Sequence, residues 1–526
     1  MQFYKHTLKI FTLLFVSLLG SSCDKYFELD RPVQFPWQNA QELELAVREG
    51  YLQLSNDPWF SPLGTLSMVH FGQSDIVRLL PEAIQGNNYA TQYYNRAYRT
   101  APADKEVGEA FQFLYYIITN NNAALKLLEE AEAAGQDPFE GMVQADRELV
   151  DRYRGELHFM RGVAYWYLAR IYAPPFDPQG SNDSRHFVLR TTFANTAEEL
   201  KEPYLGTVAE VWDLIQRDLE TAKELLPENY VTTEIQPKGR ANKYAAAAML
   251  SRVYFITGQH DKALAETDFV IGSSMYNLQE DPIVAFNRTG ADDAKEVIWE
   301  IPYVATSTRF DRTPGIYGKN LYNNNNRGGN YSTYTLGYAA LKQIGWMADG
   351  LKGDYTELPE AQDDKRYTQL YKRYEAYGAP GGDPNATVKV ARPEVWVDKY
   401  FRSSSGRYSN RPMIRLAEVY LTRAILRFNT GDQEGAAQDL NVVRHRAGLT
   451  PITASAITAE AIHNERIKEL ASEHGDRVYY LIGLRQPIGI GDRDASRFSA
   501  IQPGYADYFW PVPLVEQEQN QSYNTP

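Results

Sequence analysis

Two stretches of the sequence combine aromatic rings with carboxylate, amide and guanidinium groups. The candidates in the first stretch are Asp75, Arg78, Tyr93 and Tyr94. The candidates in the second stretch are Tyr322, Arg327, Tyr331, Tyr334 and Trp346. Sugar rings have an apolar face of C–H groups and an edge of hydroxyls, so a sugar site needs aromatic surfaces with polar groups around them. The two stretches offer this mixture, and the simpler alternative is that these rings pack one segment against another.

Glu469 and Glu473 are a second candidate for chemistry. Four residues apart on an expected helix, their Cβ atoms would be about 5–6 Å apart, near the carboxyl separation of about 5–5.5 Å in retaining glycosidases. Arg466 and Arg477 lie on either side, so charge pairing on a helix explains the two glutamates more simply. The sequence contains no Gly-rich phosphate loop, G-x-S-x-G elbow or H-E-x-x-H zinc helix. It therefore predicts no catalytic residue, no cofactor and no metal ligand.

Paired helices are the elements expected to position these residues. Residues 239–272 carry small and aromatic residues at helical spacing on both sides of Thr257 and Gly258. Residues 414–447 repeat the pattern, with Thr430 and Gly431 at the turn. A short turn makes consecutive helices antiparallel neighbours, and such hairpins are typical of tetratricopeptide repeats. We expect a mostly α fold in which helical hairpins form an α-solenoid scaffold.

The remaining helices and the irregular regions follow from periodicity and from helix-end signals. Thr207 with Glu210 three residues later indicates a capping box, and Pro174 ends the helix before it. Further helices are expected over residues 38–54, 106–134 (as a pair), 146–172, 207–226 and 458–484. The scaffold is assigned to residues 38–54, 106–272 and 411–485, and the irregular, ligand-binding regions to residues 55–103 and 275–410. Short strands are expected at 296–301, 388–390 and 395–400, and an extended tail at 509–526.

Residues 1–22 have the layout of an export signal. Lys5 and Lys9 precede an apolar run too short to span a membrane, and small residues then lead into Cys23. Cys23 is predicted to carry a lipid as the first residue of the mature protein, and the alternative is an incidental cysteine after an ordinary signal. A tether over residues 23–37 and a single domain over residues 38–526 are expected to follow.

The composition is that of an ordinary globular protein with many tyrosines. The chain has 526 residues, of which 43% are hydrophobic and 23% charged. Its net charge of −13 argues against nucleic acid as a partner, because phosphate binding needs a basic surface. Tyrosine occurs 37 times, against 22 Phe and 8 Trp, and its flat ring with a hydroxyl suits wet binding surfaces.

Several segments taken in order resemble the SusD/RagB family of Bacteroidetes outer-membrane lipoproteins. They are residues 155–172, 207–227, 239–254 and 465–485 and the closing tail FWPVPLVEQEQNQSYNTP. The resemblance implies a non-enzymatic, surface-exposed lipoprotein that captures oligosaccharides for a SusC-type TonB-dependent transporter of the outer membrane. Its membrane contact would be the lipid on Cys23 alone.

Two alternatives stay open. Some members of the family serve peptide uptake, so the captured ligand could be a peptide. The hairpins could also form a protein-interaction scaffold without a small ligand.

Overall fold

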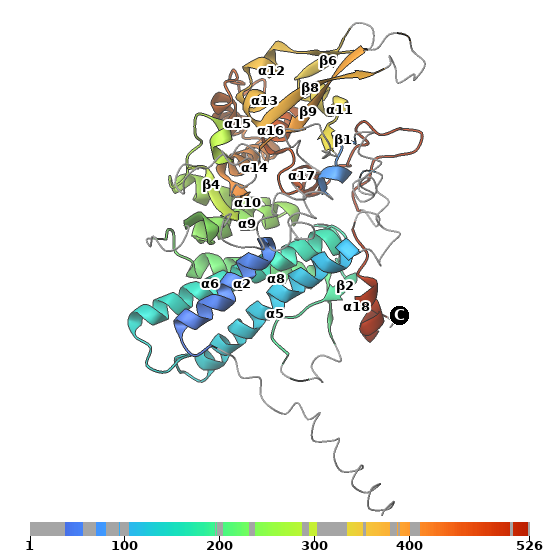
Figure 1. Ribbon diagram of the computed structural model, residues 1–526. Helices are drawn as coiled ribbons and strands as arrows, with labels where there is room; N and C mark the ends of the chain where they lie inside the picture. Colours follow the sequence, from blue (N-terminus) through green and yellow to red (C-terminus); the bar gives the residue numbers. More distant parts are fainter. Residues whose placement is uncertain are drawn as a thin grey trace, which may run out of the picture.

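Long helices lie side by side in the first half of the chain in the computed structural model (Figure 1). They are α2 (Ala40–Ser55), α5 (Lys105–Ala133), α6 (Gln144–Tyr172) and α8 (Val208–Leu225). The structure describes residues 37–55, 70–79, 94, 105–194, 196, 203–230, 237–286, 294–301, 334–350, 354–378, 387, 390–399, 411–504 and 509–523. None of the helices in these ranges combines the length and the hydrophobicity needed for a transmembrane span.

Helix α8 begins where the capping box predicts it. The Thr207 hydroxyl oxygen accepts a hydrogen bond from the Glu210 backbone N–H (3.1 Å), and the Glu210 carboxylate accepts one from the Thr207 N–H (2.8 Å). These two bonds satisfy groups that the first turn of a helix leaves unpaired. Helix α6 ends at Tyr172, before Pro174, also as expected. Its C-terminal half is buried on all sides, because α5 and α8 both pack against it.

Residues 105–133 form one continuous helix, so the expectation of a helix pair there was wrong. Asparagine is a poor helix former because its amide competes with the backbone, yet Asn120, Asn121 and Asn122 are accommodated within α5. Their side-chain amides donate to backbone carbonyl oxygens of Ala46, Leu157 and Arg190, at 2.8, 3.1 and 3.1 Å. The asparagines therefore join α5 to its neighbours instead of ending it.

The two hairpins have matching bounds, which confirms the predicted tetratricopeptide-like scaffold. The first consists of α9 (Lys243–Ile256) and α10 (His260–Gly272), and the second of α14 (Leu416–Asn429) and α15 (Gln433–Arg446). Gly258 and Gly431 occupy the same place in the two turns, with φ of 75° and 87°. This left-handed conformation costs glycine little, because it has no Cβ. Helix α10 packs against α14, so the hairpins stack on each other.

Strands are longer and more extensively paired than expected. One antiparallel sheet has the strand order β1-β5-β9-β8. Its strands β8 and β9 lie at the opposite end of the molecule from the long helices α5 and α6 (Figure 1). Its strands are β1 (Val77–Leu79), β5 (Tyr334–Leu336), β9 (Val390–Val397) and β8 (Tyr371–Gly378). The expected strand at residues 296–301 is β4 (Val297–Ile301), which pairs with β10 (Arg411–Arg415). The expected strands at 388–390 and 395–400 are one strand, β9, and β8 was not expected.

Shorter elements complete the described part of the fold. They are β2 (Arg185–Val188), β3 (Leu205–Thr207), α11 (Tyr338–Gln343), β6 (Met347–Asp349), β7 (Tyr355–Glu357), α12 (Pro359–Asp363) and α13 (Lys365–Leu370). Strand β2 pairs with β3, and β6 pairs with β7, both antiparallel. The insert is thus built of short helices and strands in its described parts.

The expected C-terminal helix over residues 458–484 is two helices. Helix α16 (Ala459–Leu470) and helix α17 (Asp476–Gly483) are separated by a break. Ser472, His474 and Gly475 have φ of 69°, 49° and 72° there, a conformation that cannot continue a right-handed helix. The tail was also expected to be extended, but it contains the short helix α18 (Leu514–Gln519).

Candidate functional site

Pairing of β1 with β5 brings the two aromatic-rich stretches of the sequence together. Val77 lies opposite Leu336, Arg78 opposite Thr335, and Leu79 opposite Tyr334. The first stretch therefore leaves the sheet after Leu79 at the same point where the second stretch enters it at Tyr334. Arg78 and Tyr334, which were predicted separately, therefore lie on neighbouring strands.

Arg78 remains partly accessible at this place. Its side chain is 22% exposed and lies 3.9 Å from the Glu394 carboxylate. Its Nη1 donates a hydrogen bond to the Tyr338 hydroxyl (3.0 Å), and the guanidinium carbon is 4.7 Å from the centre of the Tyr338 ring. A guanidinium held next to a ring and a carboxylate offers directional donors beside an apolar surface.

Tyr338 in turn stacks on Tyr355. The two ring centres are 4.2 Å apart and the rings are nearly parallel, at 10°. Tyr355 is half-buried, and the Lys342 ammonium lies 5.9 Å from the centre of its ring. We call Arg78, Tyr338, Lys342, Tyr355 and Glu394 the tyrosine platform.

The backbone under the platform is held by Asp492. Its two carboxylate oxygens accept hydrogen bonds from the backbone N–H groups of Tyr338 (2.6 Å) and Ala339 (2.8 Å) at the start of α11. A carboxylate at a helix N-terminus satisfies donors that have no partner within the helix. This contact fixes the direction in which α11 presents Tyr338.

The sequence analysis did not single out the two stacked tyrosines. Tyr338 lies four residues after Tyr334 in the same tyrosine- and asparagine-rich run, so a signal for it existed. Tyr355 lies on β7, outside any aromatic cluster of the sequence. Its position beside Tyr338 depends on how β7 pairs with β6.

Asp75 is engaged in an ion pair with Arg477 of α17. The two distances are 2.8 Å for Nε–Oδ1 and 2.7 Å for Nη2–Oδ2. Burial lowers the pKa of Arg477, but the Asp75 carboxylate outweighs burial, so the pKa is raised. A two-point contact of this kind occupies both carboxylate oxygens, so Asp75 positions the segment before β1.

Tyr94 lies next to the same region and is half-buried. The Arg493 guanidinium carbon is 4.3 Å from the centre of its ring, and Arg493 Nε donates to the Tyr94 backbone carbonyl (2.8 Å). Arg493 also donates to the carbonyl oxygens of Gly72 and Ser74. Tyr94 is therefore attached to the segment that leads into β1.

Tyr334 and Trp346 have buried rings. Tyr334 packs edge-on against Phe71, with ring centres 6.0 Å apart, and burial raises its pKa. Trp346 packs between Tyr367 and Tyr371, at 5.0 and 5.1 Å. Both side chains are 0% exposed. In this structure the two rings pack the interior, which is the alternative raised for them from the sequence, and we do not include them in the proposed site.

The other predicted residues lie outside the described part of the chain. They are Cys23, Tyr93, Tyr322, Arg327 and Tyr331. Their assignments stay predictions.

Glu469 and Glu473 are held in a buried network of charges. Arg415 Nη1 donates to Glu469 (2.8 Å), and its Nη2 donates to Glu473 (2.7 Å). Burial opposes the charged form of Glu469, but Arg446, Arg415 and Arg366 outweigh it and lower the pKa.

Charge pairing of these two glutamates was expected with Arg466 and Arg477, but their partners come from other elements. Arg466 pairs with Asp476 and Arg477 with Asp75. Glu473 lies beyond the end of α16. A carboxylate that is fixed between arginines is poorly suited to donate or accept a catalytic proton, because its ionised form is so strongly favoured. Among the described residues, His, Cys, Asp and Glu side chains form no group of three that could hold a metal ion.

Comparison with known proteins places this fold in a family. Residues 73–255 match a family model described as starch-binding and associating with the outer membrane. Residues 271–481 match the model of the SusD family. The chain belongs to the SusD/RagB family.

Relatives and solved structures agree with the assignment. SusD-like proteins P2 and P25 of Formosa agariphila are each 24% identical to the chain. The first alignment covers 85% of this chain and 82% of that protein, and the second covers 97% and 96%. The crystal structure of a putative sugar-binding protein from Bacteroides vulgatus is 20% identical and superimposes with a TM-score of 0.71, over 93% of this chain and 98% of that one. At this identity the structural likeness shows the fold.

Proposed function

We propose that this protein is a non-enzymatic, lipid-anchored protein of the outer membrane that captures oligosaccharides at its surface. The observation that carries the proposal is the tyrosine platform beside the β1–β5 pair. A half-buried ring, a guanidinium and a carboxylate lie within one cluster there, and this combination suits the apolar face and hydroxyl edge of a sugar.

The two predicted stretches extend the same site. Tyr93 follows β1 in the chain, and Tyr322, Arg327 and Tyr331 precede β5. Because β1 and β5 are paired, we assign these four residues to the ligand site together with the platform. The captured sugar would then pass to a SusC-type TonB-dependent transporter, the partner that the family resemblance implies.

Sugar binding is tested by calorimetric titration of the full chain with a panel of plant, host and microbial oligosaccharides, starch fragments included. We expect one class of oligosaccharide to bind. Changing Tyr355→Ala should weaken that binding at least fivefold, because the ligand loses an aromatic surface. The matched control is Tyr204→Ala, which removes a tyrosine that is 50% exposed and lies near β3, and it should bind as the wild type does.

Two results would overturn the proposal. One is that no oligosaccharide of the panel binds while a peptide library does. The other is sugar binding that Tyr355→Ala leaves unchanged.

The lipid anchor is tested separately by labelling cells with radioactive palmitate. Label should enter the wild-type chain and be absent from Cys23→Ala. Incorporation that persists in Cys23→Ala would contradict the anchor while leaving the sugar site untouched.

A further inference from the structure

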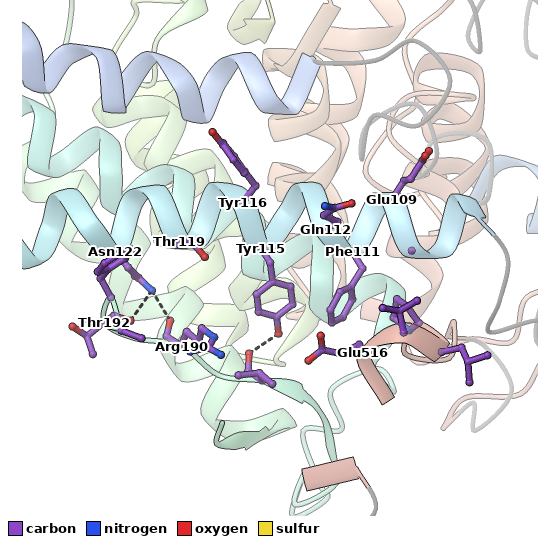
Figure 2. Close-up of a pocket in the computed structure, with 17 residues that line it drawn as sticks. Glu109, Phe111, Gln112, Tyr115, Tyr116, Thr119, Asn122, Arg190, Thr192 and Glu516 are labelled. Atoms are coloured by element: carbon purple, nitrogen blue, oxygen red, sulfur yellow. Dashed lines mark hydrogen bonds between the residues drawn. The ribbon is translucent and has the colours of Figure 1, made fainter. Parts of the chain in front are cut away.

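A cavity of about 910 Å³ opens beside α5, at a distance from the sheet that carries the platform (Figures 1 and 2). Helix α5 forms one wall, residues 188–194 after β2 form another, and the start of α18 closes a third side. The volume is within the range of roughly 300–1,000 Å³ that is typical of small-molecule sites. Its walls come from three segments that lie far apart in the sequence, so no local pattern indicates the cavity.

Carbon atoms dominate the walls. The rings of Phe111 and Tyr115 lie side by side with centres 4.6 Å apart, and Val188 lies opposite them. At the opening, Tyr116 is 52% and Val515 61% exposed. Large apolar side chains on the rim of an apolar cavity indicate a surface that a ligand would cover.

Two of the polar side chains in the cavity bond to its own wall. The Tyr115 hydroxyl donates to the Val188 carbonyl (2.5 Å), and the Asn122 amide donates to the carbonyls of Arg190 (3.1 Å) and Thr192 (3.4 Å), as Figure 2 shows. These bonds fix the wall after β2.

Arg190 brings a positive charge to the cavity. Within the described part of the chain, no acidic side chain forms an ion pair with its guanidinium. Two carboxylates, those of Glu109 and Glu516, also line the cavity. The Glu516 carboxylate accepts a hydrogen bond from the Asn520 amide (3.3 Å). Arg190 is the one cationic side chain among the lining residues, and a guanidinium binds a carboxylate through two parallel hydrogen bonds.

We propose that this cavity binds an amphipathic carboxylate of the long-chain acyl type. The acyl chain would lie against Phe111, Tyr115 and Val188, and the carboxylate would contact Arg190. The apolar walls account for the chain, and the charge of Arg190 accounts for the head group. The proposal does not depend on sugar binding.

The test is calorimetric titration of the full chain with hexadecanoate, kept below the concentration at which it forms micelles. We expect saturable binding of one molecule per chain. Changing Arg190→Gln should weaken hexadecanoate binding at least tenfold and leave methyl hexadecanoate, which has no charged head group, unaffected. Changing Thr119→Trp, at an exposed position of α5 that lines the cavity, should abolish binding of both compounds by filling the space.

Arg185→Gln is the matched control. Arg185 is the first residue of β2, the strand that ends two residues before Arg190, and it does not line the cavity. Its guanidinium lies 3.8 Å from the Glu210 carboxylate. The variant should bind hexadecanoate as the wild type does. The proposal is overturned if hexadecanoate does not saturate, if Arg190→Gln binds it with unchanged affinity, or if Thr119→Trp still binds it. If an apolar peptide bound in the cavity and hexadecanoate did not, the cavity would be assigned to a protein partner instead.

Discussion

Arg477 and Asp75 join the C-terminal helix pair to the segment that leads into β1. The ion pair has two short contacts, at 2.8 and 2.7 Å, between residues 402 positions apart. The two side chains are only 11% and 15% exposed. Water therefore screens the pair weakly, and each charge depends on the other.

Changing Asp75→Asn should lower the free energy of unfolding by about 2–3 kcal/mol, because it leaves the Arg477 guanidinium buried without its counter-charge. Urea denaturation measures this change. The control is Glu132→Gln, which removes a carboxylate that is 66% exposed from its pair with Arg154, and it should have a much smaller effect. If Asp75→Asn left stability unchanged but abolished sugar binding, Asp75 would contact the ligand, as the sequence predicted.

His474 should make stability depend on pH. It is 7% exposed, and its Nε2 is 2.6 Å from the Pro412 carbonyl oxygen. Burial lowers its pKa to about 4, whereas an unfolded chain has a histidine pKa of about 6.5. The unfolded state therefore binds this proton more tightly, so the stabilisation is complete above about pH 6.5 and is lost as pH falls toward 4.

Guanidinium unfolding between pH 4 and 7.5 checks this prediction. The wild type should lose stability as pH falls through that range, and His474→Asn should show a shallower dependence. Burial also lowers the pKa of His463, so part of the dependence should remain in the variant. The control His445→Asn changes an exposed residue of α15 and should match the wild type. Equal slopes for His474→Asn and the wild type would contradict the assignment.

Gly491 should tolerate no side chain. Its φ is +57°, and a Cβ atom there would lie 2.3 Å from the Asp75 carbonyl oxygen. Gly491→Ala is expected to cost about 2 kcal/mol or more, from the backbone conformation and from the clash together. In the control Gly272→Ala, the added methyl would meet no atom within 4 Å at the end of α10, so stability should stay the same or rise slightly. Thermal unfolding compares the two, and equal melting temperatures would refute the prediction.

Local signals predicted the helical scaffold well. Thr207 and Glu210 specify a helix start through bonds between residues three apart, and Gly258 and Gly431 mark turns through their own backbone freedom. Such features need no knowledge of the rest of the fold. The single helix α5 depends on contacts of the opposite kind, because the amides of its asparagines bond to Ala46, Leu157 and Arg190 on other segments.

The candidate site was predictable only as a region. The sequence identified the stretches around Arg78 and Tyr334, but it could not tell which rings face outward. All three residues of β5 are buried, so alternation along that strand carries no information. Tyr355 reaches the platform only through the pairing of β6 with β7, which no periodicity in the sequence reveals.

The pairing of β1 with β5 also sets an order of events during synthesis. Leu79 leaves the ribosome long before Tyr334, its opposite neighbour in the sheet. Contacts between such distant positions form slowly, because the intervening chain must first be ordered. A nascent chain that stopped short of Tyr334 would contain the long helices of its first half and still lack the strand that pairs with β1.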